Sequence, residues 1–150
     1  MGDACYDTAV RLVARRPHSR LELQRKLRRR GFDDDAVDAA LARCRERGYL
    51  DDGEFAAALV RTRSGSRGRR AIAAELAQRG VGRELVGAAL EGLPAKDELT
   101  AALALVRRRL SVRSEPPNLR ELLDDAGPKL MRRGFPPAVI REACRQALDL

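Results

Sequence analysis

The chain has 150 residues, which suits one compact domain or a short array of similar units. Hydrophobic residues make up 44% of it, and this apolar share excludes a disordered polymer. Aromatic residues are only 3% and tryptophan is absent, so the composition favours helices over a β-sandwich. No apolar run reaches membrane-spanning length and no signal peptide precedes the first helix, so we expect a cytoplasmic protein without membrane contact.

The net charge of +8 rests almost entirely on arginine, because Lys26, Lys96 and Lys129 are the only lysines. The guanidinium group binds phosphates and carboxylates through paired hydrogen bonds. A basic surface of this kind predicts a nucleic acid or an acidic protein as partner. The alternative is a genome that prefers arginine codons, in which case the charge carries no function.

Residues 1–48 predict three helices. The first runs over about 6–16, and a capping box at 19–22 opens the second. The second helix ends at Gly31, and the three carboxylates of 33–35 favour the positive end of the next helix dipole. Gly48 closes that third helix.

The second unit starts with a strong helix signal. Asp51 is a predicted N-cap, and Glu54 stands at the third helical position, where it supports the cap. The helix that follows is expected to bury Phe55, Ala58 and Leu59.

The third unit opens with a helix over 97–110, and Pro116-Pro117 interrupts the chain after it. Pro128 is expected to kink or start the next helix. The predicted fold is therefore all-α, with nine short helices in three tandem three-helix repeats that form an elongated array, straight or curved. The predicted repeats cover residues 1–48, 49–95 and 96–150.

Three glycines anchor this repetition, at intervals of 49 and 54 residues. A leucine stands four residues before each glycine, an arginine directly before it, and an apolar residue directly after it. The repeated positions are Leu27, Gly31 and Phe32, then Leu76, Gly80 and Val81, then Leu130, Gly134 and Phe135. Each glycine is predicted to end a helix in the left-handed conformation, so that the next apolar residue folds back onto that helix.

Four arginine clusters recur in these repeats and are the candidate binding residues. They are Arg28, Arg29 and Arg30; Arg67, Arg69 and Arg70; Arg107 and Arg108, with Arg109 completing the run; and Arg132 and Arg133. A charge run is usually a solvated face, and at least one member of each run should either snorkel, with its aliphatic stem along apolar surface, or pair locally. Their recurrence in stacked repeats predicts a basic stripe that follows a phosphate backbone or an acidic groove.

The second cluster lies in a glycine-rich segment, 65–70, that lacks the Gly-Lys-Ser/Thr ending of a phosphate-binding loop. Two interpretations stay open. The backbone amides either hold an anion at a helix start, or the segment is a flexible, solvated loop.

The sequence contains no predicted catalytic set, so we expect neither an enzyme nor a cofactor. His18 is the single histidine and is given a structural or solvent-facing role, because it has no nucleophile to activate. The acidic runs 33–35 and 51–52 are interpreted as helix caps rather than metal sites. The cysteines lack the spacing of zinc ligands or disulfides, and Cys44 and Cys144 are predicted core residues; the remaining one is Cys5.

Several of these motifs, taken in order, resemble the RecX family of regulatory proteins, over nearly the whole chain. The matching stretches are Arg16 to Leu23, Lys26-Leu27, Arg30-Gly31-Phe32, Gly48 to Asp52 with Phe55-Ala56, Gly68 to Ile72, Glu75-Leu76, Arg79-Gly80-Val81, and Arg132 to Phe135 with Val139-Ile140. The segment from Pro116 to Pro128 departs from the family pattern.

This resemblance implies a monomeric helical clamp that lies in the groove of the filament formed by the recombinase RecA on single-stranded DNA. It implies inhibition of filament extension, ATP hydrolysis and strand exchange, and so a role in DNA repair, homologous recombination and the SOS response. DNA contact should be weak and sequence-independent, because the three phenylalanines occupy core-like positions and leave Tyr6 and Tyr49 for base stacking. The alternative is a helix-turn-helix-like DNA-binding regulator that acts without RecA.

Overall fold

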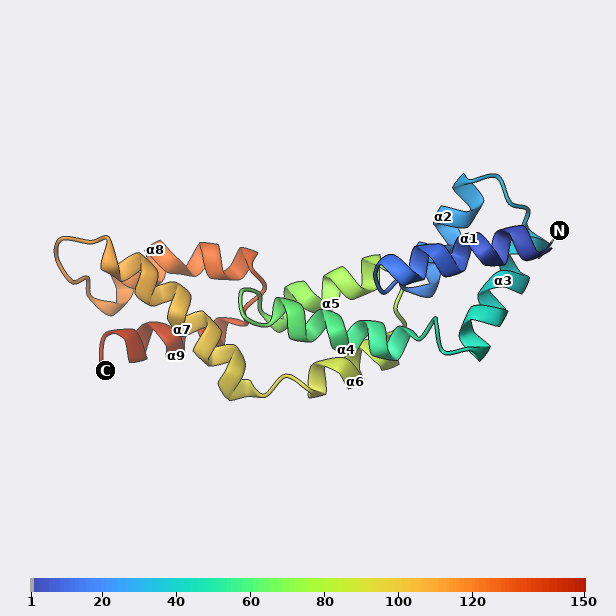
Figure 1. The fold of residues 1–150 in the computed structure, drawn as a ribbon. Helices are drawn as coiled ribbons and strands as arrows, with labels where there is room; N and C mark the ends of the chain where they lie inside the picture. The colour runs from blue at the N-terminus through green and yellow to red at the C-terminus, as the bar shows by residue number, and fades with distance from the viewer. Residues whose placement is uncertain (1) are drawn as a thin grey trace. The chain divides into compact units, whose positions relative to one another are not determined.

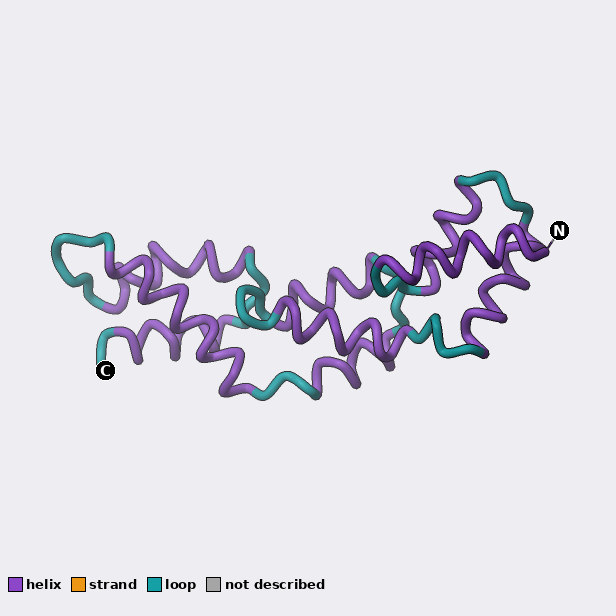
Figure 2. The backbone as a smooth tube through the Cα atoms, viewed as in Figure 1, coloured by secondary structure: helices purple, strands orange, loops and turns teal. Residues whose placement is uncertain are grey.

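The computed structural model describes residues 2–150, and this part of the chain contains nine helices and no strand (Figures 1 and 2). The helices are α1 Gly2–Arg15, α2 Arg20–Arg29, α3 Asp34–Glu46, α4 Asp52–Arg63, α5 Arg69–Gln78, α6 Arg83–Glu91, α7 Ala95–Ser111, α8 Leu119–Arg132 and α9 Pro137–Ala147. The predicted all-α class with nine helices is confirmed.

The helices form two compact units. Unit 1 contains the chain through Ala58 together with Leu76–Ala88, and unit 2 contains Leu59–Glu75 together with Ala89–Leu150. The division falls within α4, α5 and α6, so the middle repeat contributes residues to both units.

Unit 1 is built on α1, α2 and α3, with α1 packed mainly on α3. Its buried core consists of Cys5, Tyr6, Ala9, Leu12, Leu23, Leu27, Val37, Ala40, Leu41, Cys44 and Leu50. The prediction that α1 starts near Tyr6 was wrong by about one turn. The additional turn is held because Cys5 is buried and the Asp3 carboxylate lies 3.2 Å from the guanidinium of Arg43.

Unit 2 has its core among α7, α8 and α9. The core residues are Ala101, Ala102, Val106, Leu122, Ala126, Leu130, Phe135, Ile140, Ala143 and Cys144. Pro128 lies inside α8 and does not start it, because Asn118 caps the helix by accepting the Glu121 N–H at 2.8 Å. The buried residues of α8 keep a four-residue spacing on both sides of the proline, so one apolar face continues past it.

The three repeat glycines end their helices as the sequence predicts. Gly31, Gly80 and Gly134 have φ values of +95°, +81° and +91°. After α8, the Gly134 N–H donates to Met131 O at 3.0 Å and the Phe135 N–H donates to Leu130 O at 3.1 Å. This pair of bonds is the Schellman arrangement, which satisfies the last carbonyl groups of a helix.

His18 has a structural role in unit 1, with only 3% of its surface exposed. Its Nδ1 lies 2.9 Å from Arg16 O, and its Nε2 lies 2.8 Å from the Lys26 Nζ. Because an ammonium group only donates, the imidazole is neutral, accepts at Nε2 and donates its Nδ1–H to the carbonyl. Burial lowers the pKa of His18 below its ordinary value of 6.5.

We therefore expect the free energy of unfolding to fall as pH drops below about 6.5. As pH falls, the histidine is protonated in the unfolded chain before it is protonated in the folded chain. The stability that neutral His18 contributes is therefore complete above the unfolded pKa and is lost as pH falls towards the lower folded pKa. Urea titrations between pH 5 and 7 measure it. The variant His18→Gln should lack this slope, since the chain has only one histidine, and an equal slope in the variant would contradict the assignment.

Candidate functional site

Two of the predicted arginine clusters meet in unit 2, where the start of α5 contacts the turn after α8. The Gly68 N–H donates to Arg133 O at 2.9 Å, and the Arg70 N–H donates to Gly134 O at 3.0 Å. A Cβ atom on Gly134 would overlap the backbone nitrogen and Cβ of Ala71, so the two backbones approach as closely as glycine permits. We call this contact, with the side chains of Arg67, Arg70, Arg132 and Arg133, the basic joint.

Unit 1 contains a contact of the same kind between the start of α2 and the turn after α5. The Ser19 Oγ–H donates to Arg79 O at 2.6 Å, and a Cβ atom on Gly80 would overlap Leu21. The Arg79 guanidinium lies 3.3 Å from the Glu22 carboxylate, so its charge is neutralised there.

The two joints differ in charge at several equivalent positions: at the offsets of 49 and 54 residues that relate the repeat glycines, Leu21 corresponds to Arg70, Gln78 to Arg132 and Glu22 to Ala71. The 49-residue offset that relates Gly31 to Gly80 also relates Ser19 to Gly68 and Glu22 to Ala71. With alanine in place of the glutamate, Arg133 has no carboxylate to pair with, and its guanidinium donates instead to Ser66 O at 3.2 Å. The joint in unit 2 therefore keeps its positive charge.

Arg69 is held inside unit 2 by Glu98 of α7, whose side chain is only 2% exposed. The Arg69 N–H donates to Glu98 Oε2 at 2.7 Å, Nε–H donates to Oε1 at 2.8 Å, and a terminal N–H reaches Leu93 O at 3.1 Å. Of the two interpretations of segment 65–70, the helix start holds for this residue, because α5 begins at Arg69. These bonds fix Arg69 as a tie between α5 and α7.

The variant Glu98→Gln should lower the free energy of unfolding by about 2 kcal/mol, because the charge-assisted bonds to Arg69 become neutral ones in a buried place. Chemical denaturation measures this. Glu115→Gln is the matched control, since Glu115 is exposed and should unfold like the parent chain. A loss below about 0.5 kcal/mol for Glu98→Gln would contradict the tie.

Arg67 is only partly neutralised within the basic joint. The Arg63 guanidinium donates two hydrogen bonds to the Glu75 carboxylate, both with an N–O distance of 3.0 Å. The Arg67 guanidinium lies 3.3 Å from the same carboxylate. The hydrogen bonds to Glu75 raise the pKa of Arg63. The Arg67 side chain remains 48% exposed, so its charge stays accessible.

The other three arginines of the basic joint are exposed, and they form no ion pair with any residue of 2–150. The start of α5 adds the partial positive charge of a helix N-terminus to this group. The arrangement is suited to bind an anion such as a phosphate or a partner's carboxylate.

The first and third arginine clusters each contain one locally paired member, as expected. Arg28 lies 3.0 Å from Asp34, while Arg29 and Arg30 are exposed at the end of α2 in unit 1. In unit 2, Arg107 and Arg108 are exposed on α7, and Arg109 forms a fork with Asp125. The hydrogen bonds from Arg109 lower the pKa of Asp125.

The acidic runs act as helix caps. Asp33 Oδ1 accepts the Ala36 N–H at 2.8 Å, and Asp51 Oδ1 accepts the Glu54 N–H at 3.1 Å. Within residues 2–150 no group of histidine, cysteine and acidic side chains could hold a metal ion. No helix in this range is long and apolar enough to cross a membrane.

Of the two tyrosines, only Tyr49 is exposed, at 47%. Tyr6 was expected to be available for base stacking, and this was wrong. It is buried in the core of unit 1, and the Arg43 guanidinium lies 3.8 Å from the centre of its ring. Phe55 and Phe135 are buried as predicted, and Phe32 is half-buried against the same core as Tyr6.

Repeated three-helix units that dock through glycine turns define a helical-repeat protein. Two family profiles match the chain in tandem: "RecX, first three-helix domain" over residues 5–44 and "RecX, second three-helix domain" over residues 51–90. The chain belongs to the RecX family.

Two relatives illustrate the similarity, and both are named "Regulatory protein RecX". The protein of Thermobifida fusca (strain YX) is 42% identical over 146 residues, which cover 93% of this chain and 76% of that protein. The protein of Halorhodospira halophila (strain DSM 244 / SL1) is 41% identical over 146 residues, which cover 97% and 89%. These names support a regulatory role.

The fold is also that of a solved RecX structure. The crystal structure of RecX from Lactobacillus salivarius superposes with a TM-score of 0.88 at 18% identity, over 99% of this chain and 97% of that one. At this identity the likeness concerns the fold alone.

Proposed function

We propose that this chain is a non-enzymatic regulator that binds RecA and the RecA filament on single-stranded DNA. It inhibits filament extension, ATP hydrolysis and strand exchange, and thereby modulates recombination, DNA repair and the SOS response. Membership of a family of regulatory proteins supports the class of function. The observation that carries the proposal is the basic joint, in which exposed arginines from two repeats gather at one helix start.

The candidate contacts to RecA or DNA fall into two groups. The first is the basic joint itself. The second consists of the exposed arginines Arg28, Arg29, Arg30, Arg107 and Arg108. Arg69 contributes by positioning α5, since its guanidinium is engaged by Glu98 and Leu93 O.

DNA contact is weak and sequence-independent in this proposal, because strand-binding proteins need several exposed aromatic side chains for base stacking. Tyr49 is the single exposed one of the residues that the structure describes. Salt-sensitive phosphate contacts remain, and the larger share of the affinity comes from RecA. The chain acts as a monomer in the cytoplasm and needs no cofactor.

A binding comparison separates this proposal from a DNA-binding regulator that acts without RecA. Fluorescence anisotropy of the labelled chain is measured against naked single-stranded DNA, duplex DNA and RecA-coated single-stranded DNA over a range of salt concentrations. We expect the tightest binding to the RecA-coated strand and steeper loss with salt on naked DNA. Tighter, sequence-dependent binding to duplex DNA without RecA would favour the other regulator.

A further inference from the structure

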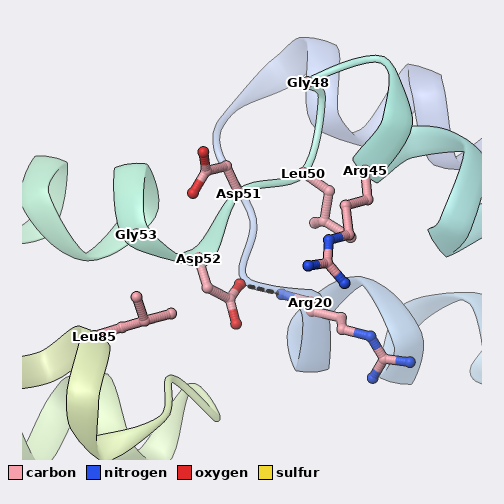
Figure 3. A pocket seen from close by; sticks show the side chains of 8 residues that line it. All are labelled: Arg20, Arg45, Gly48, Leu50, Asp51, Asp52, Gly53 and Leu85. Carbon is pink, nitrogen blue, oxygen red and sulfur yellow. Dashed lines mark hydrogen bonds between the residues drawn. The ribbon is translucent and has the colours of Figure 1, made fainter.

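Unit 1 contains a pocket of about 520 Å³ between the start of α2, the end of α3 and the start of α4 (Figure 3). Its lining combines basic, acidic and apolar side chains with two glycines: Arg20, Arg45, Gly48, Leu50, Asp51, Asp52, Gly53 and Leu85. Leu85 is 41% exposed, so its side chain presents apolar surface at the edge of the pocket.

Unit 2 contains an equivalent contact at the start of a helix, and there the arginine guanidinium is also paired. The residue that opens the second helix of a repeat donates its N–H to a carboxylate of the following repeat: Arg20 to Asp52 Oδ1 at 2.8 Å in unit 1, and Arg69 to Glu98 Oε2 at 2.7 Å in unit 2. In unit 2 the second oxygen of Glu98 also binds the Arg69 guanidinium. The Arg20 guanidinium has no such partner among residues 2–150, and Figure 3 shows it directed away from Asp52.

The carboxylates of the pocket leave its two arginines available. Asp51 Oδ1 caps α4, and Asp52 Oδ1 holds the Arg20 N–H. Arg45 is exposed, forms no ion pair within residues 2–150, and extends along Leu50 in Figure 3. The pocket is thus lined by two guanidinium groups that form no ion pair among residues 2–150 and by the exposed side chain of Leu85.

We propose that this pocket binds one carboxylate side chain of a partner protein, flanked by an apolar residue. The carboxylate pairs with the guanidinium groups of Arg20 and Arg45, as Glu98 pairs with the Arg69 guanidinium in unit 2, and the apolar neighbour packs on the exposed Leu85. A nucleic acid phosphate would match the arginines and leave Leu85 uncovered. An adjoining hollow carries Asp38 and Glu46, which repel a long acidic run and favour a single acidic residue.

The test uses the isolated full chain and therefore does not depend on RecA or DNA. Acetyl-Leu-Glu-Leu-amide is titrated while the NMR signals of the Leu50 and Leu85 methyl groups are followed. We expect saturable shifts with this peptide, and affinity lower by about tenfold for acetyl-Leu-Gln-Leu-amide, which lacks the charge. The variant Arg20→Gln should lose binding by a similar factor, whereas Arg25→Gln, an exposed arginine of the same helix, should bind like the parent chain.

Equal melting temperatures of both variants confirm that the fold is intact. Absence of saturable shifts, or equal affinity for the two peptides, would overturn the proposal. Inorganic phosphate that moves the same methyl groups with the affinity of the acidic peptide would also overturn it, in favour of a general anion site.

The substitution Asp52→Glu tests the comparison with unit 2. The longer side chain should reach the Arg20 guanidinium and reduce peptide binding by about tenfold without removing any charge. Unreduced peptide binding in this variant would contradict the premise that the Arg20 guanidinium is unpaired because the Asp52 side chain is too short to reach it.

Discussion

Gly134→Ala is expected to lower the free energy of unfolding by about 3 kcal/mol or more, combining left-handed strain with overpacking. The added Cβ would overlap the backbone of Ala71 as well as occupy a position where φ is +91°. Gly31→Ala is the matched control, because Gly31 has φ +95° with open space around its Cβ. The control should lose only about 1–2 kcal/mol, from the backbone conformation alone.

Urea denaturation followed by far-UV circular dichroism measures both variants. The difference between them isolates the close approach of α5 to the turn after α8, since the backbone strain is common to both. Equal losses for Gly134→Ala and Gly31→Ala would show that the contact in unit 2 does not exist in solution.

The triple variant of Arg67, Arg70 and Arg133 to glutamine should inhibit RecA at least about tenfold less effectively, because three charged donors are lost from the basic joint. Its melting temperature should stay close to that of the parent chain, since these side chains are exposed and Glu75 keeps both of its hydrogen bonds from Arg63 when Arg67 is replaced. The assay is the concentration of chain needed to halve RecA's DNA-dependent ATP hydrolysis.

A second triple variant controls for the change in net charge. Arg120, Arg141 and Arg145 are also exposed and lie in the same unit. Their replacement by glutamine removes the same charge away from the basic joint and should leave inhibition within about twofold of the parent. If both triple variants lose inhibition equally, then overall charge and not the joint is responsible.

Local patterns in the sequence predicted most of the fold. The capping box of Ser19 and Glu22, the cap at Asp33 and the left-handed glycines depend on residues a few positions apart, and all of them are present. The repeat boundaries at 1–48, 49–95 and 96–150 stay a prediction, as does the assignment of individual arginines to DNA or RecA.

The contacts that define the site could not be predicted in this way. Arg69 and Glu98 are 29 residues apart, and only the packing of α7 against the start of α5 makes them partners. The sequence therefore predicts Arg69 as a candidate binding residue together with Arg67 and Arg70, and does not single out Glu98. One signal was present: Gly68 stands twelve residues before Gly80, as Ser19 stands before Gly31, which marks both as helix starts in equivalent repeats.

The predictions that Pro128 starts a helix and that Tyr6 is available for base stacking were wrong for a related reason. A proline inside a helix is usually costly, but α8 is held on both sides of it by buried residues such as Leu122 and Leu130. Tyr6 is predicted to be available for base stacking because the phenylalanines occupy core-like positions, whereas the structure places it in the core of unit 1.

The most direct test of the proposed function is RecA's ATP hydrolysis on single-stranded DNA, measured while the purified chain is titrated at moderate salt. We predict inhibition at amounts well below one chain per RecA if filament growth is blocked at its ends, or near stoichiometric amounts if the chain coats the groove. Unchanged hydrolysis at a large excess of chain, with DNA binding retained in the absence of RecA, would contradict the account.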